Sequence, residues 1–137
     1  MEALDVRATA WMAVLLCTLV CGAARAALDG DFPEPGMVTL VDFGAESCLP
    51  CKAMAPILKK LDAAYKGRAA VRFVSTVKHP ETARRYRVSI IPTQIVFDHR
   101  GEIVGWHTGF MDEKGLRAKL DELIEAAKRE KASGAAP

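Results

Sequence analysis

Two cysteines separated by two residues are the strongest chemical signal in the sequence. Cys48 and Cys51 lie in the segment 47–52, SCLPCK, between a β-branched apolar run and a stretch with helical spacing. At this spacing the two sulfurs can meet across the first turn of a helix, which is typical of a redox-active pair. The free amides and partial positive charge at a helix N-terminus stabilise a thiolate. We therefore expect Cys48 to be the exposed nucleophile and Cys51 to be the more buried, resolving cysteine.

A structural disulfide and half of a zinc site are the other interpretations of this pair. Zinc would require two further ligands. The three histidines, His79, His99 and His107, show no paired spacing with the cysteines or with one another. The position of the pair between a strand and a helix favours the redox interpretation. We predict no metal site and no cofactor.

The elements that position these cysteines alternate between strands and helices. The apolar run 37–43 predicts a buried strand before the cysteines, and apolar residues at helical spacing from Met54 to Tyr65 predict a helix from Cys51 onward. Asp112 is the expected N-cap of a last amphipathic helix. The remaining predicted elements are strands at 71–77, 93–97 and 102–107, a short helix at 80–87 and a hairpin turn at 98–101. The order β-α-β-α-β-β-α predicts an α/β fold with a mixed central sheet flanked by helices.

Length and composition restrict the chain to one globular domain. Its 137 residues are 50% hydrophobic and 26% charged, which excludes disordered and fibrous classes. Because 19 Lys and Arg against 17 Asp and Glu leave a net charge of only +2, we expect no nucleic-acid partner. The predicted organisation is a signal peptide at 1–26, a leader at 27–36, the folded domain at 37–131 and a disordered tail at 132–137.

An uncharged segment near the N-terminus predicts export. Residues 11–24, WMAVLLCTLVCGAA, form an apolar run shorter than the roughly 20 residues that span a membrane. Small residues at Ala24 and Ala26 suit cleavage after Ala26. An uncleaved anchor and lipidation of Cys21 are the alternatives, and Val20 disfavours lipidation because it is not small. Export would place the chain in a periplasmic or other extracytoplasmic compartment, where disulfide chemistry is permitted.

Several motifs, in order along the chain, resemble the thioredoxin family. The segment 41–52, VDFGAESCLPCK, followed by Met54-Ala55-Pro56, resembles the active-site strand and helix of thioredoxins. Ile91-Pro92-Thr93 resembles the cis-proline loop of the family, and Gly101 and Gly109 match its later glycines. The resemblance implies a thioredoxin-like fold reduced to a minimal core, because the leader is too short for the family's first strand and helix.

The resemblance also implies roles for the residues around the cysteines. It makes Cys48 the nucleophile and Cys51 the resolving cysteine. Asp42 matches the family's buried carboxyl, whose burial should raise its pKa and suit it to relay a proton to or from Cys51. The lysine that neighbours this carboxyl in the family is replaced by Phe73, so we expect Asp42 to be harder to ionise.

Substrate contacts are expected on two loops. Pro92 should follow a cis peptide bond, which turns the backbone of Ile91 toward a substrate strand. Leu49 and Pro50, between the cysteines, are the other expected substrate contacts. The family's tryptophan before the first cysteine is Ser47 here, which removes an apolar docking wall, and Leu49 stands where glycine is common.

The function implied is an exported thiol-disulfide oxidoreductase that reduces disulfides in partner proteins. Pro50 resembles the reducing members of the family, whereas strong oxidants tend to carry His at this position. Electrons would come from a membrane-embedded thiol-disulfide donor, and we expect a monomer. Two alternatives remain: a thiol oxidase or isomerase of the same fold, and a non-catalytic module that binds extended peptides along the Ile91-Pro92 edge.

Overall fold

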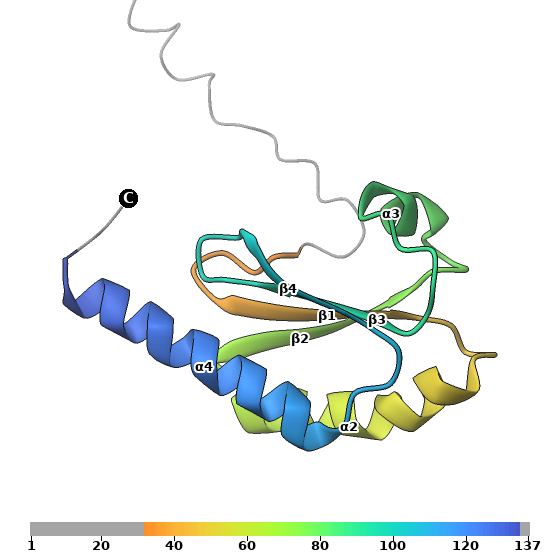
Figure 1. The fold of residues 1–137 in the computed structure, drawn as a ribbon, viewed down its shortest axis with the longest axis horizontal. Coiled ribbons are helices and arrows are strands. Elements are labelled where there is room, and N and C mark those ends of the chain that lie inside the picture. The colour runs from red at the N-terminus through yellow and green to blue at the C-terminus, as the bar shows by residue number, and fades with distance from the viewer. Residues whose placement is uncertain (1–31, 135–137) are drawn as a thin grey trace, which may run out of the picture.

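The computed structural model describes residues 32–134, so the predicted signal peptide, Cys17 and Cys21 lie outside the described residues. Within 32–134 the elements follow the predicted order β-α-β-α-β-β-α, which is confirmed (Figure 1). They are β1 (Val38–Gly44), α2 (Leu49–Tyr65), β2 (Ala69–Ser75), α3 (Pro80–Arg85), β3 (Thr93–Phe97), β4 (Ile103–Thr108) and α4 (Glu113–Ala132).

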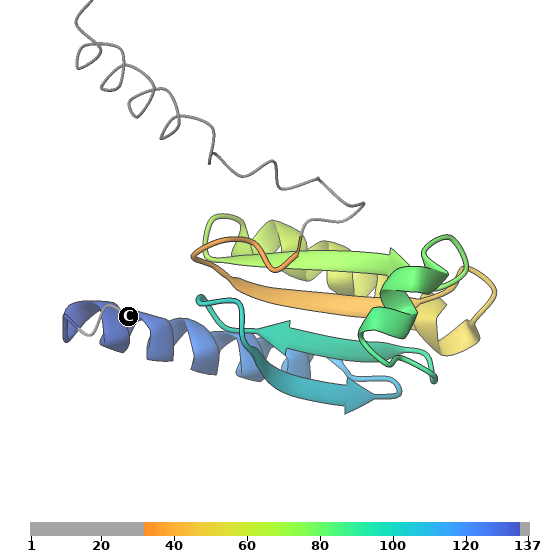
Figure 2. The same ribbon diagram turned by 90° about the horizontal axis from the view of Figure 1, so that it is seen from above.

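The strands form one mixed sheet in the order β2-β1-β3-β4. β1 pairs in parallel with β2 and antiparallel with β3, and β3 pairs antiparallel with β4. β2 and β4 are therefore the edge strands (Figure 2). α2 and α4 cover one face of the sheet, and α3 lies against the other (Figure 1). The predicted α/β fold with a mixed, helix-flanked sheet is confirmed.

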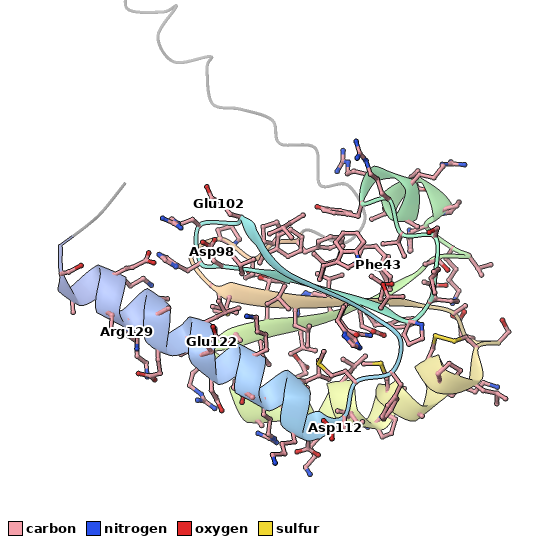
Figure 3. All side chains as sticks on the ribbon, in the orientation of Figure 1. Phe43, Asp98, Glu102, Asp112, Glu122 and Arg129 are labelled. Atoms are coloured by element: carbon pink, nitrogen blue, oxygen red, sulfur yellow. A yellow bond between two sulfur atoms is a disulfide. The ribbon has the colours of Figure 1, made fainter. Side chains whose placement is uncertain are left out.

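β1 is the scaffold of the site because it is buried along its whole length. Successive side chains of a strand point to opposite faces of the sheet. Leu40 belongs to the core shared with α2 and α4, whereas Phe43 belongs to the core on the α3 side (Figure 3). Asp42 has the same parity as Leu40, so its side chain points toward α2 and α4.

The two long helices each bury one apolar stripe against the sheet. In α2 the buried residues are Cys51, Met54, Leu58, Leu61 and Tyr65, and in α4 they are Leu116, Leu120, Ile124 and Ala127. The predicted N-cap of α4 is confirmed, since the Asp112 carboxylate accepts a hydrogen bond from the Gly115 amide at 2.8 Å. The Tyr65 hydroxyl donates to Asp121 at 2.8 Å and ties α2 to α4. Within residues 32–134, none of the helices has both the length and the apolar composition of a membrane span.

The start of α2 differs from the prediction. The helix begins at Leu49 rather than at Cys51, with Pro50 in its first turn. Proline suits the first turn because its missing N–H would have no helical partner there. The earlier start places Cys48 at the N-cap and Cys51 inside the first turn.

Other boundaries shift by a few residues. β2 runs from Ala69 to Ser75, two residues earlier than the predicted strand 71–77. Its bounds follow its pairing with β1, which runs from Val38 to Gly44. Phe32, in the predicted leader, packs against Tyr86 with ring centroids 5.3 Å apart and against Phe97 at 6.0 Å. The folded domain therefore includes residues before 37. At the other end, α4 continues through Ala132, the first residue of the predicted tail.

Candidate active site

The two cysteines form a disulfide at the N-terminal end of α2 (Figure 3). Their Cα atoms are 5.2 Å apart, and the Cys51 amide donates a hydrogen bond to the Cys48 sulfur at 3.3 Å. Cys48 is half-buried, whereas Cys51 is only 3% exposed. The pair is therefore asymmetric: a partner disulfide can approach the sulfur of Cys48 but not that of Cys51.

The local sequence favours a thiolate at Cys48 once the disulfide is reduced. Cys48 is the N-cap of a 17-residue helix, and the first turn of that helix contains no acidic residue. The unpaired amides of the first turn and the helix dipole both stabilise a negative charge at this position. A cysteine in such an environment is suited to act as a nucleophile.

Asp42 is completely buried on β1, with 0% of its surface exposed. Its Oδ1 accepts a hydrogen bond of 2.7 Å from Nε2 of Gln94, and its Oδ2 has no hydrogen-bond partner among residues 32–134. Burial raises the pKa of this carboxyl to about 6, and the hydrogen bond from Gln94 opposes part of that rise. Asp42 can therefore gain and lose a proton near neutral pH, as a general acid or base requires.

Gly44 brings the backbone of β1 close to the buried cysteine. It lies two residues after Asp42, so both positions face α2. A Cβ atom at Gly44 would lie 3.2 Å from the Cys51 sulfur and 2.9 Å from Cε2 of Phe73. The ring of Phe73 thus occupies the space beside Cys51 that a side chain at position 44 would need. The Cys51 sulfur thus approaches β1 at Gly44, two residues along the strand from Asp42 and on the same face of the sheet.

A groove with a volume of about 560 Å³ runs beside Cys51 between α2 and β2. Its residues include Phe73, Val71, Ala55 and Leu58, so its floor is apolar, while Lys52 and Lys59 are among the residues that line it. Phe73 is 47% exposed at this edge of the sheet. Phe73, where the resemblance leads one to expect lysine, therefore adds an apolar side chain to the surface next to the disulfide.

The predicted substrate loop lies before β3, and its Ile91–Pro92 peptide bond is cis. The Pro92 carbonyl accepts a hydrogen bond from the Gly109 amide at 2.8 Å, and the Thr93 hydroxyl donates to the Ile90 carbonyl at 2.7 Å. Pro92 is buried and Ile91 is half-buried. The loop is thus held on both sides by hydrogen bonds.

Leu49 and Pro50, the predicted substrate contacts that lie between the two cysteines, are open to solvent. Leu49 is 77% exposed, and Pro50 is also exposed. The loop before them is fixed by Glu46, which accepts hydrogen bonds from Lys78 at 2.6 Å and from Ser75 at 3.3 Å. The hydrogen bond from Lys78 lowers the pKa of Glu46.

Gln94 is the site residue that the sequence analysis missed. It is 1% exposed and lies directly opposite Asp42 in the β1–β3 ladder. The available signal was a single amide side chain inside the apolar run 93–97, TQIVF. No group of three His, Cys, Asp or Glu side chains within residues 32–134 is arranged to hold a metal ion.

Comparisons with known proteins agree with this geometry. The sequence model of the thioredoxin family matches residues 27–122. The thioredoxins of Staphylococcus aureus strains Mu50 and MW2 are each 42% identical over 99 residues, which cover 70% of this chain and 93% of each relative. The matched region contains the cysteine pair, the buried carboxyl and the cis-proline loop. The chain belongs to the thioredoxin family of thiol-disulfide oxidoreductases, which act on disulfides in proteins.

Proposed function

We propose that this thiol-disulfide oxidoreductase works as a reductant in an exported compartment, with Cys48 as nucleophile and Cys51 as resolving cysteine. The observation that carries the assignment is the asymmetry of the pair. Cys48 is half-buried at the N-cap of α2, whereas Cys51 is 3% exposed on the same face of the sheet as Asp42. In this arrangement the Cys48 sulfur can attack a partner disulfide, and the buried Cys51 sulfur can attack only Cys48.

The proposed reaction has two exchanges. The Cys48 thiolate attacks one sulfur of a partner disulfide, which forms a mixed disulfide and releases the other partner sulfur as a thiolate that takes a proton from solvent. The Cys51 thiol then gives its proton to the Asp42 carboxylate and attacks the sulfur of Cys48. The Cys48–Cys51 disulfide forms, and the second partner sulfur leaves as a thiolate that takes a proton from solvent. Two electrons pass from the cysteine pair to the partner.

The reducing direction rests on the residues between the cysteines. Leu49 and Pro50 offer no side-chain donor that would stabilise a reduced thiolate selectively. When the helix N-terminus alone stabilises the thiolate, the cysteine pair is less strongly oxidising than a pair whose thiolate also receives a hydrogen bond from a cationic side chain. Ile91 and the exposed Leu49 would contact the extended segment of a substrate.

Export rests on the sequence. The family match begins at residue 27, immediately after the predicted cleavage site at Ala26. A reductant in an oxidising compartment needs electrons from outside it, so we propose a membrane-embedded thiol-disulfide donor. The test is the mass of the mature protein in its native host: an N-terminus at Ala27 in the exported fraction supports the proposal, and an intact chain in the cytoplasm contradicts it.

Equilibrium titration against glutathione tests the direction. Cys17 and Cys21 are replaced by Ser, so that Cys48 and Cys51 are the only thiols in the chain. A reduction potential of roughly −250 mV or lower supports a reductant, and one above about −180 mV makes the protein an oxidant or isomerase. Cys48→Ser in the same background is the matched control. If it retained turnover, the nucleophile assignment would be wrong. If the parent protein showed no turnover and Cys48→Ser bound peptides as tightly as the parent, the protein would be a peptide-binding module.

A further inference from the structure

Three polar side chains lie in one row across the sheet. Asp42 on β1 is paired in register with Gln94 on β3, and Gln94 is paired with His107 on β4. Directly opposed residues share a face of the sheet. Each of the three has one side-chain atom that is buried without a hydrogen-bond partner among residues 32–134: Oδ2 of Asp42, Oε1 of Gln94 and Nε2 of His107.

The row has one strong internal contact. Nε2 of Gln94 lies 2.7 Å from Oδ1 of Asp42 and 3.2 Å from the sulfur of Met54. Buried polar groups normally satisfy their hydrogen bonds, and a hydrogen bond to a charged acceptor is the stronger kind. Met54 follows Cys51 by one turn of α2, so Gln94 is held between the helix that carries the resolving cysteine and the carboxyl that serves it.

We propose that Gln94 is the positioning residue for Asp42: its amide occupies Oδ1 and so presents Oδ2 as the oxygen that takes the proton from Cys51. The inference rests on the proposed role of Asp42 in the resolving step. Gln94 does not touch the reacting sulfurs through any described contact. It acts through Asp42, by fixing which carboxyl oxygen is free and by stabilising the ionised form.

Few other described groups could take this role. Among the buried residues of α2, Tyr65 is the other titratable group besides Cys51, and its hydroxyl donates to Asp121 on α4. From β2 the residue paired with Asp42 is Phe73, which is apolar. α4 presents Leu116 and Leu120 to the core. Beyond Gln94, a cavity of about 610 Å³ between the sheet and α4 is lined by His107, Lys119 and Glu122 among others. The amide of Gln94 is the polar donor in direct contact with the carboxyl.

The departure at Phe73 gives this contact its importance. A lysine beside the carboxyl would stabilise the ionised form through its charge, and Phe73 cannot. The hydrogen bond from Gln94 is the interaction that opposes burial at Asp42. The resemblance predicted that Asp42 would lack a lysine on β2 to stabilise its ionised form. Gln94 on β3 supplies part of that stabilisation instead.

The test removes the amide and keeps the size of the side chain. Gln94→Met is made in the full chain with Cys17 and Cys21 replaced by Ser. The reduced protein reacts with a chromogenic aromatic disulfide in a stopped-flow instrument. The first aromatic thiol released reports attack by Cys48, and the second reports resolution by Cys51.

We expect the pH midpoint of the second release to rise by about one pH unit in Gln94→Met, while the first release keeps its profile. Carbon-13 NMR titration of the oxidised protein gives an independent reading, because Cys51 does not titrate as a disulfide. The Asp42 carboxyl signal should titrate about one pH unit higher than in the parent. An unchanged midpoint in both measurements would overturn the proposal.

Three further variants keep the result interpretable. Met54→Leu alters the packing around Gln94 but leaves its bond to Asp42, so both midpoints should stay in place. In an Asp42→Asn background, Gln94→Met should no longer move the second release, as expected for residues that act through one another. If Gln94→Met fails to fold, Gln94→Glu replaces it, and its second carboxylate should raise the Asp42 midpoint further. Absence of the second release in the parent protein would instead contradict the proposed function.

Discussion

Replacing Asp42 by Asn should stabilise the oxidised protein at neutral pH and slow its chemistry. The carboxyl is 0% exposed, and burial raises its pKa from the ordinary value of 3.8 to about 6. Asparagine has nearly the same shape, and its carbonyl oxygen can accept the hydrogen bond that Gln94 gives to Oδ1. The variant therefore removes the cost of ionising a buried group while retaining the packing around it.

The size of the effect follows from the two pKa values. At pH 7 the carboxyl is ionised in both the folded and the unfolded protein. Its pKa is higher by about 2 in the folded protein, so ionisation there costs about 3 kcal/mol more. Below about pH 3.8 both states are protonated and the cost vanishes. Between these limits the folded state binds more protons than the unfolded state, so the contribution of Asp42 to stability falls as the pH rises.

The assay is urea unfolding of the oxidised parent and of Asp42→Asn at several values between about pH 3.5 and 8. The variant should gain close to zero stability at the acidic end and about 3 kcal/mol above pH 7. A gain below about 1 kcal/mol at pH 7, or one that does not change with pH, would refute the argument that Asp42 is a destabilised buried acid. The same variant should resolve the mixed disulfide more slowly, because Cys51 loses its proton acceptor.

Substitutions at three other positions, with Phe73→Ala as a second-site control for one of them, test separate parts of the structure. Pro50→His should raise the reduction potential by about 30 mV or more, measured against glutathione, because a ring donor stabilises the reduced thiolate; an unchanged potential would contradict the argument for a reductant. Gly44→Ala should cost about 1–3 kcal/mol in urea unfolding, because its Cβ would crowd Cys51 and Phe73, and Phe73→Ala should recover part of that loss if the ring is the main obstacle. Asp98→Ala should cost about 2 kcal/mol at neutral pH, since its carboxylate accepts two backbone hydrogen bonds of 2.9 Å in the hairpin turn (Figure 3). Burial raises the pKa of Asp98, but the two backbone hydrogen bonds together with the hydrogen bond and charge of Arg100 outweigh it and lower the pKa. The cost of the substitution should therefore shrink as the pH falls through the carboxyl's pKa, and a loss that does not change with pH would show that the carboxylate charge is not responsible.

The local chemistry could be predicted because it depends on short-range spacing. Two intervening residues place Cys48 and Cys51 within one helical turn whatever the rest of the fold does. The N-cap at Asp112 was equally local, since the capping side chain and the amide it accepts from are three residues apart. The buried strand before the cysteines followed from its apolar composition. These features need no knowledge of which strands are neighbours.

The partner of Asp42 could not be predicted, because it lies 52 residues away in the sequence. Gln94 becomes a neighbour only when β3 pairs with β1 in a register that sets the two residues opposite each other. A shift of one residue would turn Gln94 to the other face of the sheet. The same holds for Phe73, which reaches the space beside Cys51 only because β2 pairs in parallel with β1.

The sequence by itself determined the reactive pair, the order of the elements and the fold class, because those properties arise from residue type and spacing within a few positions. Only the tertiary structure decided which side chains surround the buried carboxyl and how far its pKa moves. Strand register and burial set the distances and the local dielectric, and both depend on contacts between residues that are remote along the chain.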